Sequence, residues 1–198
     1  LYKKTVQEST FVSTEKIFEN HILKDLGNIY LNKLTVAQCQ RAVNTWADVA
    51  PKTFKWFVFY ASKLINYGIT MELMKKNPMN KVILPKIERD NKKFDNFYSK
   101  EELNTFLNDA KGYNFRYFMF FRLLAYSGMR KGECLALKWS DIDFKNNTID
   151  INKSLASGEN NHLYLSPCKT SNSVRTLDMD AETMHYLKEW RTKQQKEM

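Results

Sequence analysis

Between residues 1 and 85, apolar side chains recur every three or four positions, which is the period of an amphipathic α-helix. The recurring positions form three groups: Ile17, Phe18 and Ile22; Val36, Cys39, Val43 and Trp46; Phe54, Phe57, Val58, Ala61, Leu64 and Ile65. Ser13 or Thr14 is a suitable N-cap for the first helix. Thr35 with Gln38 forms a capping box for the second, and Gly68 is a natural end for the third. The pattern predicts a small all-helical domain over residues 1–85.

The helical pattern weakens beyond the third group. A short helix is expected at 71–76, ended by Asn77-Pro78 because the residue before a proline is driven out of the helical region. Pro85 and the charged run 86–93 follow, with few apolar side chains. Proline and dense charge are typical of extended connections between domains. We therefore expect residues 86–97 to be a linker.

A second domain is expected over residues 98–198, and it begins with helices. Ser99 and Glu102 form a capping box in front of the first one. The stretch 115–126 is mostly apolar and aromatic, which indicates a buried helix, and Gly128 ends it. A short helix from about Arg130 follows.

Strands follow these helices, because the apolar period changes to two. This alternation predicts a hairpin around 145–147, a polar loop over 154–161 and a third strand near Val174. A last helix is expected from Asp180. The predicted fold class is therefore mainly α with a small antiparallel β-sheet, and the second domain is of the α+β type.

Charge adds a class of partner to this picture. The 31 Lys and Arg residues outnumber the 22 Asp and Glu residues, which gives a formal net charge of +9. A basic protein favours nucleic acid, because neutralising phosphates releases counterions. Solubility explains the same charge equally well, so composition alone leaves both interpretations open.

Cysteine usage and hydropathy exclude several other classes. The cysteines Cys39, Cys134 and Cys168 are far apart and form no C-x-x-C pair, so neither a disulfide framework nor a zinc site is predicted. No apolar run approaches the roughly 20 residues of a membrane-spanning helix. No basic-then-apolar signal segment opens the chain. We expect a cytoplasmic protein with no membrane association, no metal and no other cofactor.

The residues best suited to chemistry lie where the apolar helix stops. Arg130 follows Gly128 and begins the next helix, whose free N–H groups and partial positive charge favour an anion. A guanidinium at this place adds a bidentate fork that fits a phosphate. Glu133 lies one turn along and is placed to orient Arg130. A plain surface Arg–Glu pair has the same i, i+3 spacing, and spacing alone favours that interpretation.

The segment 128–143 reads G-M-R-K-G-E-C-L-A-L-K-W-S-D-I-D and resembles the first arginine box of the tyrosine recombinases, the lambda-integrase-like enzymes of phages and conjugative transposons. Residues 166–177 are similar to the P-x-K-T-x-x-S-x-R segment of that family, and residues 20–23, 34–35 and 77–78 to its core-binding domain. The resemblance implies a helical core-binding domain followed by the N-terminal part of an α+β catalytic domain.

The resemblance also implies roles for particular residues. Arg130 would be the first of two arginines that hold the scissile phosphate, and Lys169 the general acid that protonates the leaving 5′ oxygen. Glu133 would orient Arg130 from behind. Arg175 and Lys131 are candidate phosphate or DNA contacts, although an exposed strand arginine explains Arg175 equally well. No metal is needed in this scheme.

The chain departs from the family pattern at the end of the site. Family members complete it with an H-x-x-R box, a further His or Trp and a late nucleophilic Tyr. None of His21, His162 and His185 begins an H-x-x-R box. The latest tyrosine, Tyr186, falls inside a predicted helix, where packing explains it better. We therefore expect no nucleophile in this chain, which should bind DNA without cleaving it.

The resemblance implies site-specific DNA recombination, with strand cleavage and exchange through a covalent 3′-phosphotyrosine. The expected partners are double-stranded DNA with an att-type recombination site and further copies of the intact protein on that DNA. The expected location is the cytoplasm of a bacterial or phage-infected cell. Two alternatives are a non-catalytic DNA-binding regulator derived from a recombinase and a type IB topoisomerase. The integrase-like helical front domain argues against the topoisomerase.

Overall fold

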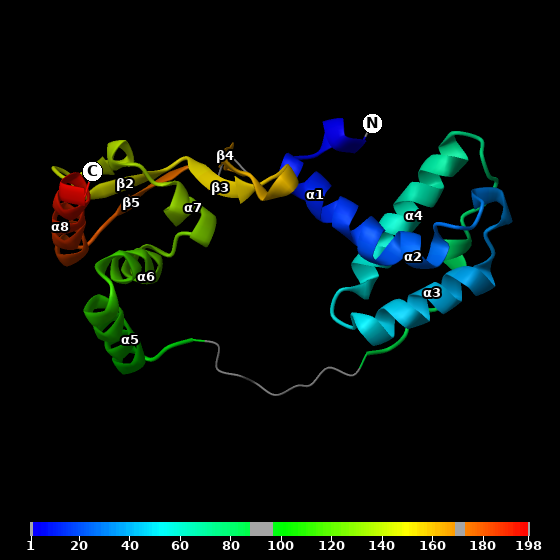
Figure 1. Ribbon diagram of the computed structural model, residues 1–198, viewed down its shortest axis with the longest axis horizontal. Helices are drawn as coiled ribbons and strands as arrows, with labels where there is room; N and C mark the ends of the chain where they lie inside the picture. The colour runs from blue at the N-terminus through cyan, green and yellow to red at the C-terminus, as the bar shows by residue number, and fades with distance from the viewer. Residues whose placement is uncertain (1, 88–96, 169–172, 198) are drawn as a thin grey trace. The chain divides into compact units, whose positions relative to one another are not determined.

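The computed structural model describes residues 2–87, 97–168 and 173–197 (Figure 1). The chain divides into two compact units, Leu1–Lys92 and Lys93–Met198. The division falls within the segment 86–97 that the sequence marks as a linker, but residues 88–96 lie outside the described residues, so the linker bounds stay a prediction. Helices make up most of the secondary structure and the strands form small antiparallel sheets, so the predicted fold class is confirmed.

Among the described residues of the first unit, all regular secondary structure is helical. Its α-helices are α1 Glu8–Ile17, α2 Leu23–Leu26, α3 Val36–Val49 and α4 Phe54–Thr70, and its helical turns are η1 Tyr2–Thr5, η2 Phe18–Ile22, η3 Leu31–Lys33 and η4 Pro78–Lys81. The turn η2 has π-helical geometry, and its flanking residues stay in the right-handed helical region, so α1 continues into α2. The three apolar groups of the sequence therefore correspond to α1 with η2, to α3 and to α4.

The predicted N-cap of the first helix is wrong. The helix α1 already begins at Glu8, so Ser13 and Thr14 lie inside it. Their hydroxyls donate to the carbonyl oxygens of Ser9 and Thr10, each at 2.8 Å. A hydroxyl that bonds back by one turn is satisfied without ending the helix, so a Ser-Thr pair is an ambiguous start signal.

The chain after α4 also differs from the prediction. The helix runs two residues past Gly68 to Thr70, and no helix forms at 71–76. Asn77 turns the chain back onto α4: its amide donates to Oγ of Ser62 at 3.0 Å and to Oδ1 of Asn66 at 2.7 Å. These side-chain bonds replace the helical ones, and they fix the segment against the helix it has just left.

The core of the first unit lies between α3 and α4. Both helices bury the apolar faces that the pattern marks, with Cys39, Val43 and Trp46 from α3 and Phe54, Phe57 and Ile65 from α4. The capping box of Thr35 and Gln38 is confirmed and starts α3. The indole Nε1 of Trp46 donates to Oδ2 of Asp25 at 2.6 Å, so the largest side chain of this core keeps a polar partner.

The second unit combines helices with two sheets (Figure 1). Its helices are α5 Lys100–Tyr113, α6 Phe115–Ser127, α7 Lys131–Ala136 and α8 Ala181–Glu197, with the turns η5 Trp139–Asp141 and η6 Glu159–Asn161. Its strands are β1 Ile142–Asp143, β2 Thr148–Ile151, β3 Lys153–Ser157, β4 Leu163–Pro167 and β5 Arg175–Asp178. One sheet has the order β1-β2-β5, and the other pairs β3 with β4.

The sheets confirm one predicted hairpin and correct the next. Strands β1 and β2 pair across the turn at 145–147, as the alternation predicts. The segment 154–161 is not a polar loop throughout, because β3 continues to Ser157 and pairs with β4 from Lys153↔Pro167 to Ser157↔Leu163. The predicted strand near Val174 begins one residue later, at Arg175, and its partner is β2. The sequence did not indicate the β3–β4 hairpin because β3 reads Lys-Ser-Leu-Ala-Ser, with no clear apolar alternation, and the leucines of β4 are exposed.

A buried arginine joins α6 to α8 in this unit. Arg122 is only 4% exposed, in the middle of the apolar helix α6. Its Nε donates to Oγ1 of Thr183 at 2.9 Å, and its Nη2 pairs with Glu182 at 2.9 Å and with Asp180 at 3.3 Å. A buried guanidinium persists only with such partners, so α8 is held in one place on α6.

We predict opposite effects from adding one methyl group at two glycines of the second unit. Neither Gly128 nor Gly112 has an atom within 4 Å of an added Cβ, but Gly128 has a φ of +62°. Gly128→Ala should lower the free energy of unfolding by about 1 kcal/mol, because an L side chain is strained there. Gly112→Ala, inside α5, should raise it by several tenths up to about 1 kcal/mol. Chemical denaturation measures both, and equal effects would show that backbone strain at Gly128 is unimportant.

Candidate phosphate-binding site

The turn between α6 and α7 fixes the position of Arg130. Gly128 ends α6, as the sequence predicts. The structure shows it in the left-handed conformation, and its N–H donates to the carbonyl of Leu124 at 3.2 Å. The hydroxyl of Ser127 donates to the carbonyl of Leu123 and accepts from the N–H of Met129 at 3.1 Å. Met129 is buried in the core of the unit. With the residue before it anchored in this way, Arg130 stands at the N-cap of α7 with extended backbone.

Close packing holds α7 against β3. A Cβ added to Gly132 would lie 3.0 Å from the carbonyl oxygen of Leu155 and closer still to Oγ of Ser154. Any larger residue would push the first turn of α7 off the strand. Gly132 therefore sets the distance between the helix that carries Arg130 and the β3–β4 ribbon.

Glu133 is the centre of the site. Its side chain is 4% exposed and accepts three hydrogen bonds from two arginines. Oε1 accepts from Nη1 of Arg130 at 3.0 Å, and Oε2 accepts from the backbone N–H of Arg130 at 3.0 Å. Oε2 also accepts from Nη2 of Arg175, in β5, at 2.9 Å. We call Arg130, Glu133 and Arg175 the arginine–glutamate cluster.

The two arginines of the cluster differ in exposure. The side chain of Arg130 is 74% exposed, whereas that of Arg175 is 29% exposed. Arg175 also donates from Nη1 to the carbonyl of Ser173 at 3.0 Å. The Arg175 guanidinium is thus partly buried and bound to protein acceptors, whereas the Arg130 guanidinium is exposed at the start of α7.

The charge of Glu133 is stabilised by these partners. Burial by itself raises the pKa of the Glu133 carboxyl, but the hydrogen bonds from Arg175 and Arg130 outweigh burial and hold the pKa below its usual range. The carboxylate is therefore charged at neutral pH and keeps both guanidinium groups in place. The neighbouring Cys134 is buried in apolar surroundings, which raise the pKa of its thiol to about 11.

Two other predicted site residues are Lys131 and Lys169. Lys131 is the exposed first residue of α7, next to Arg130. Lys169 lies outside the described residues. Sequence reasoning placed Glu133 behind Arg130 but missed its bond to Arg175, because 42 residues separate the two positions and no local spacing indicates the contact.

A second ion pair near α7 was also missed. Nζ of Lys153, the first residue of β3, lies 2.6 Å from Oδ2 and 2.7 Å from Oδ1 of Asp141. Both side chains are mostly buried, at 20% and 9% exposed. Burial raises the pKa of Asp141, but the hydrogen bonds from Lys153 and from the N–H of Lys138 lower it by more. The pKa of Asp141 is therefore below its usual value. One carboxylate takes one ammonium here, which neutralises Lys153.

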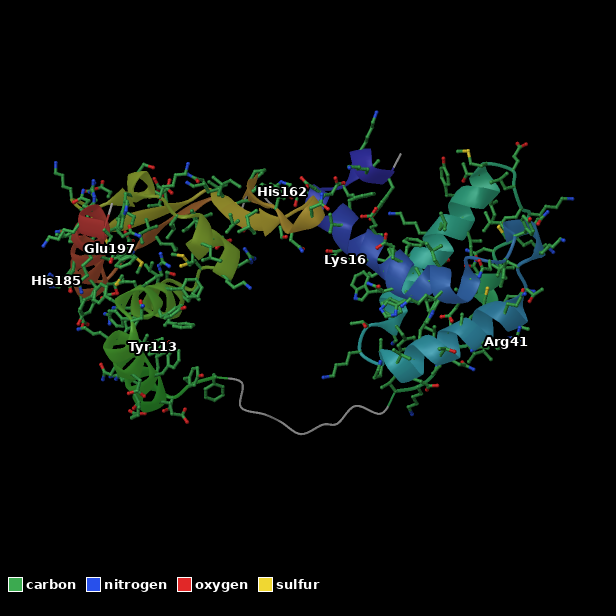
Figure 2. All side chains as sticks on the ribbon, viewed as in Figure 1. Lys16, Arg41, Tyr113, His162, His185 and Glu197 are labelled. Carbon is green, nitrogen blue, oxygen red and sulfur yellow. The ribbon has the colours of Figure 1, made fainter. Side chains whose placement is uncertain are left out.

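His162, His185 and Tyr186 of the second unit contact residues outside the cluster. His162 follows η6 in the turn of the β3–β4 ribbon, and His185 lies on an exposed face of α8 (Figure 2). The ring of Tyr186 packs edge-on against Phe118 at 4.9 Å, and its hydroxyl lies 3.1 Å from Nζ of Lys111. Its contacts are those of a residue that joins α8 to α5 and α6.

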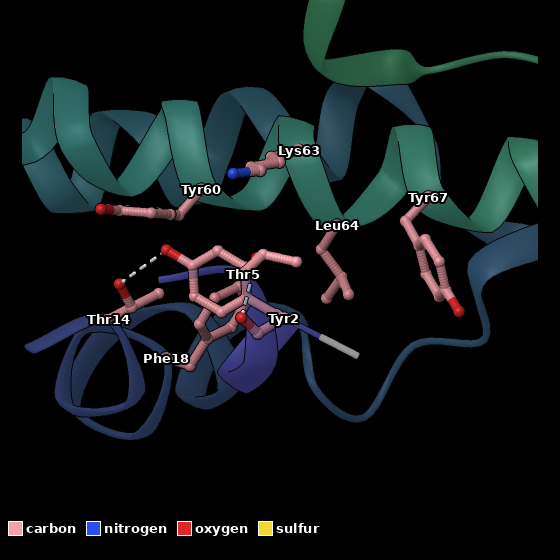
Figure 3. A pocket seen from close by; sticks show the side chains of 8 residues that line it. All are labelled: Tyr2, Thr5, Thr14, Phe18, Tyr60, Lys63, Leu64 and Tyr67. Atoms are coloured by element: carbon pink, nitrogen blue, oxygen red, sulfur yellow. Dashed lines mark hydrogen bonds between the residues drawn. The ribbon is translucent and has the colours of Figure 1, made fainter. Parts of the chain in front are cut away.

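An apolar pocket lies in the first unit. It has a volume of about 400 Å³ and lies between η1, α1 and α4 (Figure 3). Tyr2 and Thr14 are joined across it by a 3.3 Å hydrogen bond, and Nζ of Lys63 lies 4.8 Å from the centre of the Tyr2 ring. Its lining is mainly aromatic and aliphatic, and none of its residues belongs to the arginine–glutamate cluster.

Among the described residues, no group of three or more His, Cys, Asp or Glu side chains is arranged to hold a metal ion. No described helix is both long enough and apolar enough to cross a membrane.

Two family models match the chain. The model described as "Phage integrase, N-terminal SAM-like domain" matches residues 1–47, and the model described as "Phage integrase family" matches residues 96–198.

The curated relatives are recombinases and integrases. A tyrosine recombinase XerC-like protein of Caldanaerobacter subterraneus subsp. tengcongensis is 28% identical over 96% of this chain and 51% of the relative. The ICEBs1 integrase of Bacillus subtilis is 28% identical over 68% of this chain and 35% of the relative. The integrase of Staphylococcus phage L54a is 28% identical over 81% of this chain and 51% of the relative. The chain spans about half the length of the curated relatives that it matches most extensively.

The similar solved structures share the fold. The Tn1549 transposon integrase in complex with a circular intermediate DNA has a TM-score of 0.77 at 18% identity and covers 95% of this chain and 60% of its own. A lambda integrase dimer bound to a COC′ core site has a TM-score of 0.63 at 15% identity, over 82% of this chain and 56% of its own. The resemblance of the sequence to tyrosine recombinases is thus confirmed.

We predict that the charge of Glu133 stabilises the second unit in a pH-dependent way. Glu133→Gln should lower the free energy of unfolding at pH 7 by about 1–2 kcal/mol, because three charge-assisted bonds are weakened. The pKa of Glu133 is lower in the folded state than the roughly 4.3 of an unfolded glutamate, so the effect is complete above about pH 5. It is lost as the pH falls through the folded pKa.

Denaturation curves of both proteins between pH 3 and pH 7 measure this difference. Glu197→Gln, at the exposed end of α8 (Figure 2), is the matched control and should change stability by less than about 0.5 kcal/mol at any of these pH values. A difference between wild type and Glu133→Gln that stayed constant over this range would contradict a stabilising carboxylate.

Proposed function

Because the chain belongs to the phage integrase family of tyrosine recombinases, we propose that it grips duplex DNA and holds the scissile phosphate in site-specific recombination. In this proposal, residues 1–85 are the core-binding domain, residues 86–97 the linker and residues 98–198 the first part of the catalytic domain. The intact protein cleaves and exchanges strands through a 3′-phosphotyrosine. Its partners are a double-stranded att-type site and further copies of itself on that DNA.

The arginine–glutamate cluster is the observation that carries this proposal. Arg130 is held by its backbone and by Nη1, and 74% of its side chain is exposed. A guanidinium with a fixed base and free donors suits a planar, bidentate contact with a phosphate. Phosphoryl transfer develops charge on the non-bridging oxygens, and donors fixed beforehand stabilise that charge without reorganising.

The remaining roles follow from the chemistry of the reaction. Lys169 is proposed as the general acid, because an alkoxide leaving group needs a proton and an ammonium supplies one. Lys131, beside Arg130 at the exposed start of α7, is proposed as a further phosphate contact. Residues 1–198 by themselves are proposed to bind DNA without cleaving it, because none of their tyrosines matches the family's nucleophile.

The first unit supplies the wider grip on DNA in this proposal. Residues 1–90 carry 14 basic and 8 acidic side chains, a net charge of +6, against 17 and 14, or +3, in residues 91–198. On α4, Trp56 is 58% and Phe59 52% exposed, and Lys55 lies beside them. Basic and aromatic groups together are suited to the phosphates and sugars of a duplex. Because the proposed substrate is bacterial or phage DNA, the proposed location is the cytoplasm of the host cell.

We predict that the chain binds duplex DNA with an affinity that falls steeply as salt rises. Arg130→Ala should reduce the slope of log affinity against log salt by about 0.9, the value for one phosphate contact. Arg116→Ala is the matched control: Arg116 is exposed at the start of α6, roughly 18 Å of helix from the turn that carries Arg130. Fluorescence anisotropy at several salt concentrations measures the slopes. A salt-independent affinity would refute the DNA-binding proposal.

We also predict that residues 1–198 form no covalent adduct with a nicked duplex that traps phosphotyrosine. Several groups act as one unit in this chemistry, so a partial site should give almost no residual rate. Denaturing gel electrophoresis of labelled DNA detects an adduct. If one appeared and was lost in Tyr186→Phe, the proposal that these residues contain no nucleophile would be wrong.

A further inference from the structure

One carboxylate serves two guanidinium groups that come from different elements. Glu133 and Arg130 belong to the start of α7, whereas Arg175 is the first residue of β5, 42 positions further along the chain. The bond from Arg175 is thus a tertiary contact that joins the helix to the sheet. Its length of 2.9 Å and the 4% exposure of Glu133 make it a well-formed, largely desolvated ion pair.

We propose that Arg175 is a positioning residue, which holds Glu133 so that Arg130 faces the phosphate as a fixed and un-neutralised cation. This inference rests on the proposed function, because it concerns the same phosphate. It assigns Arg175 a role through another residue, in place of the direct phosphate or DNA contact that the sequence allows.

The two arginines differ in how many of their side-chain N–H groups already bind protein acceptors. Nη2 of Arg175 is bound to Glu133 and its Nη1 to the carbonyl of Ser173, so both ends of its fork are in use. Arg130 makes one side-chain bond among the described residues, from Nη1 to Glu133. Because Nη1 and Nη2 of Arg175 each already serve a protein acceptor, a phosphate at Arg175 would share these nitrogens with Glu133 and the Ser173 carbonyl. Arg130 can donate hydrogen bonds to a phosphate and still keep its bond to Glu133.

The charge of the cluster gives Arg175 a second effect. Arg130 and Glu133 alone sum to zero, and a neutral pair attracts a phosphate weakly. With Arg175 the cluster carries one net positive charge, and Oε2 of Glu133 is divided between Arg175 and the N–H of Arg130. The attraction of the carboxylate for the Arg130 guanidinium is therefore shared, and the positive charge remains at the exposed arginine.

Comparison with the Lys153–Asp141 pair shows how Arg175 changes the net charge of the cluster. There, one carboxylate binds one ammonium through both oxygens, at 2.6 and 2.7 Å, and the pair is neutral and mostly buried. Such a pair fixes β3 to the turn before β1 but offers no charge to a ligand. The arginine–glutamate cluster has the same kind of central carboxylate, and the additional guanidinium turns it into a cationic site.

The first test measures Glu133 itself and does not depend on any ligand. Carboxyl ¹³C NMR of the full chain follows the titration of Glu133 in the wild type, Arg175→Ala, Arg175→Lys and the control Arg116→Ala. Removing Arg175 should raise the pKa of Glu133, because burial then acts against fewer hydrogen bonds. Arg175→Lys should restore most of the low value, since a lysine ammonium keeps the charge and one bond. Arg116→Ala should leave it unchanged.

The second test measures the consequence at Arg130. Inorganic phosphate is titrated at constant ionic strength into ¹⁵N-arginine-labelled chain, and the Nε–H signal of Arg130 is followed. Arg175→Ala should weaken the apparent affinity on the order of tenfold, as expected for the loss of one coupled charge in a partly exposed site. Arg175→Lys should recover most of the affinity, and Arg116→Ala should stay within about twofold of wild type.

The outcomes distinguish this inference from the proposed function. If the wild-type Arg130 signal failed to respond to phosphate, the proposed phosphate role of Arg130 would be wrong, and the inference would fall with it. If it responded normally and Arg175→Ala behaved like Arg116→Ala in both tests, only the positioning role of Arg175 would be overturned. Loss of phosphate affinity in Arg175→Ala without a change in the titration of Glu133 would make Arg175 a direct phosphate contact instead.

Discussion

The second unit depends on one buried carboxylate. Glu133 is 4% exposed and carries a charge, so it needs partners to remain in the interior. It finds them in Arg130, on its own helix, and in Arg175, at the start of β5. The need to satisfy this charge therefore sets the place of the helix α7 against the sheet. The same bonds decide which guanidinium is left exposed, so one constraint serves both the fold and the candidate site.

Other parts of the unit keep this arrangement in register. Gly128 ends α6 in the left-handed conformation and turns the chain toward α7, while Gly132 lets α7 lie directly on β3. Arg122 binds α8 to α6 from inside the apolar helix. Gly128 is needed for its backbone conformation, Gly132 for the space it leaves, and the partners of Arg122 because its charge is buried. Together they fix the base of Arg130 while its tip stays exposed.

The similar proteins support the family and the fold, whereas the geometry of the site supports the proposed roles of its residues. The match to the phage integrase family over residues 96–198 shows the family, and the fold shared with the Tn1549 and lambda integrases agrees with it. Neither assigns roles to the residues of this chain. The proposed roles rest on the contacts: Arg130 has exposed donors on a fixed base, both Nη atoms of Arg175 already bind protein acceptors, and Lys153 is paired with Asp141.

The sequence determined the helices, the β1–β2 hairpin and the place of Arg130 beside Glu133, because periodicity, caps and a glycine stop act over a few neighbouring residues. It misplaced the start of α1, predicted a helix at 71–76 that does not form, and missed the β3–β4 ribbon. At the first and last of these places, hydroxyls and strands without a clear apolar alternation give ambiguous local signals. Only the tertiary structure decided that Arg175 binds Glu133 and that Lys153 binds Asp141. Such ion pairs join elements that are distant in sequence, and their partners are chosen by burial and by the pairing of the sheets, which no local spacing encodes.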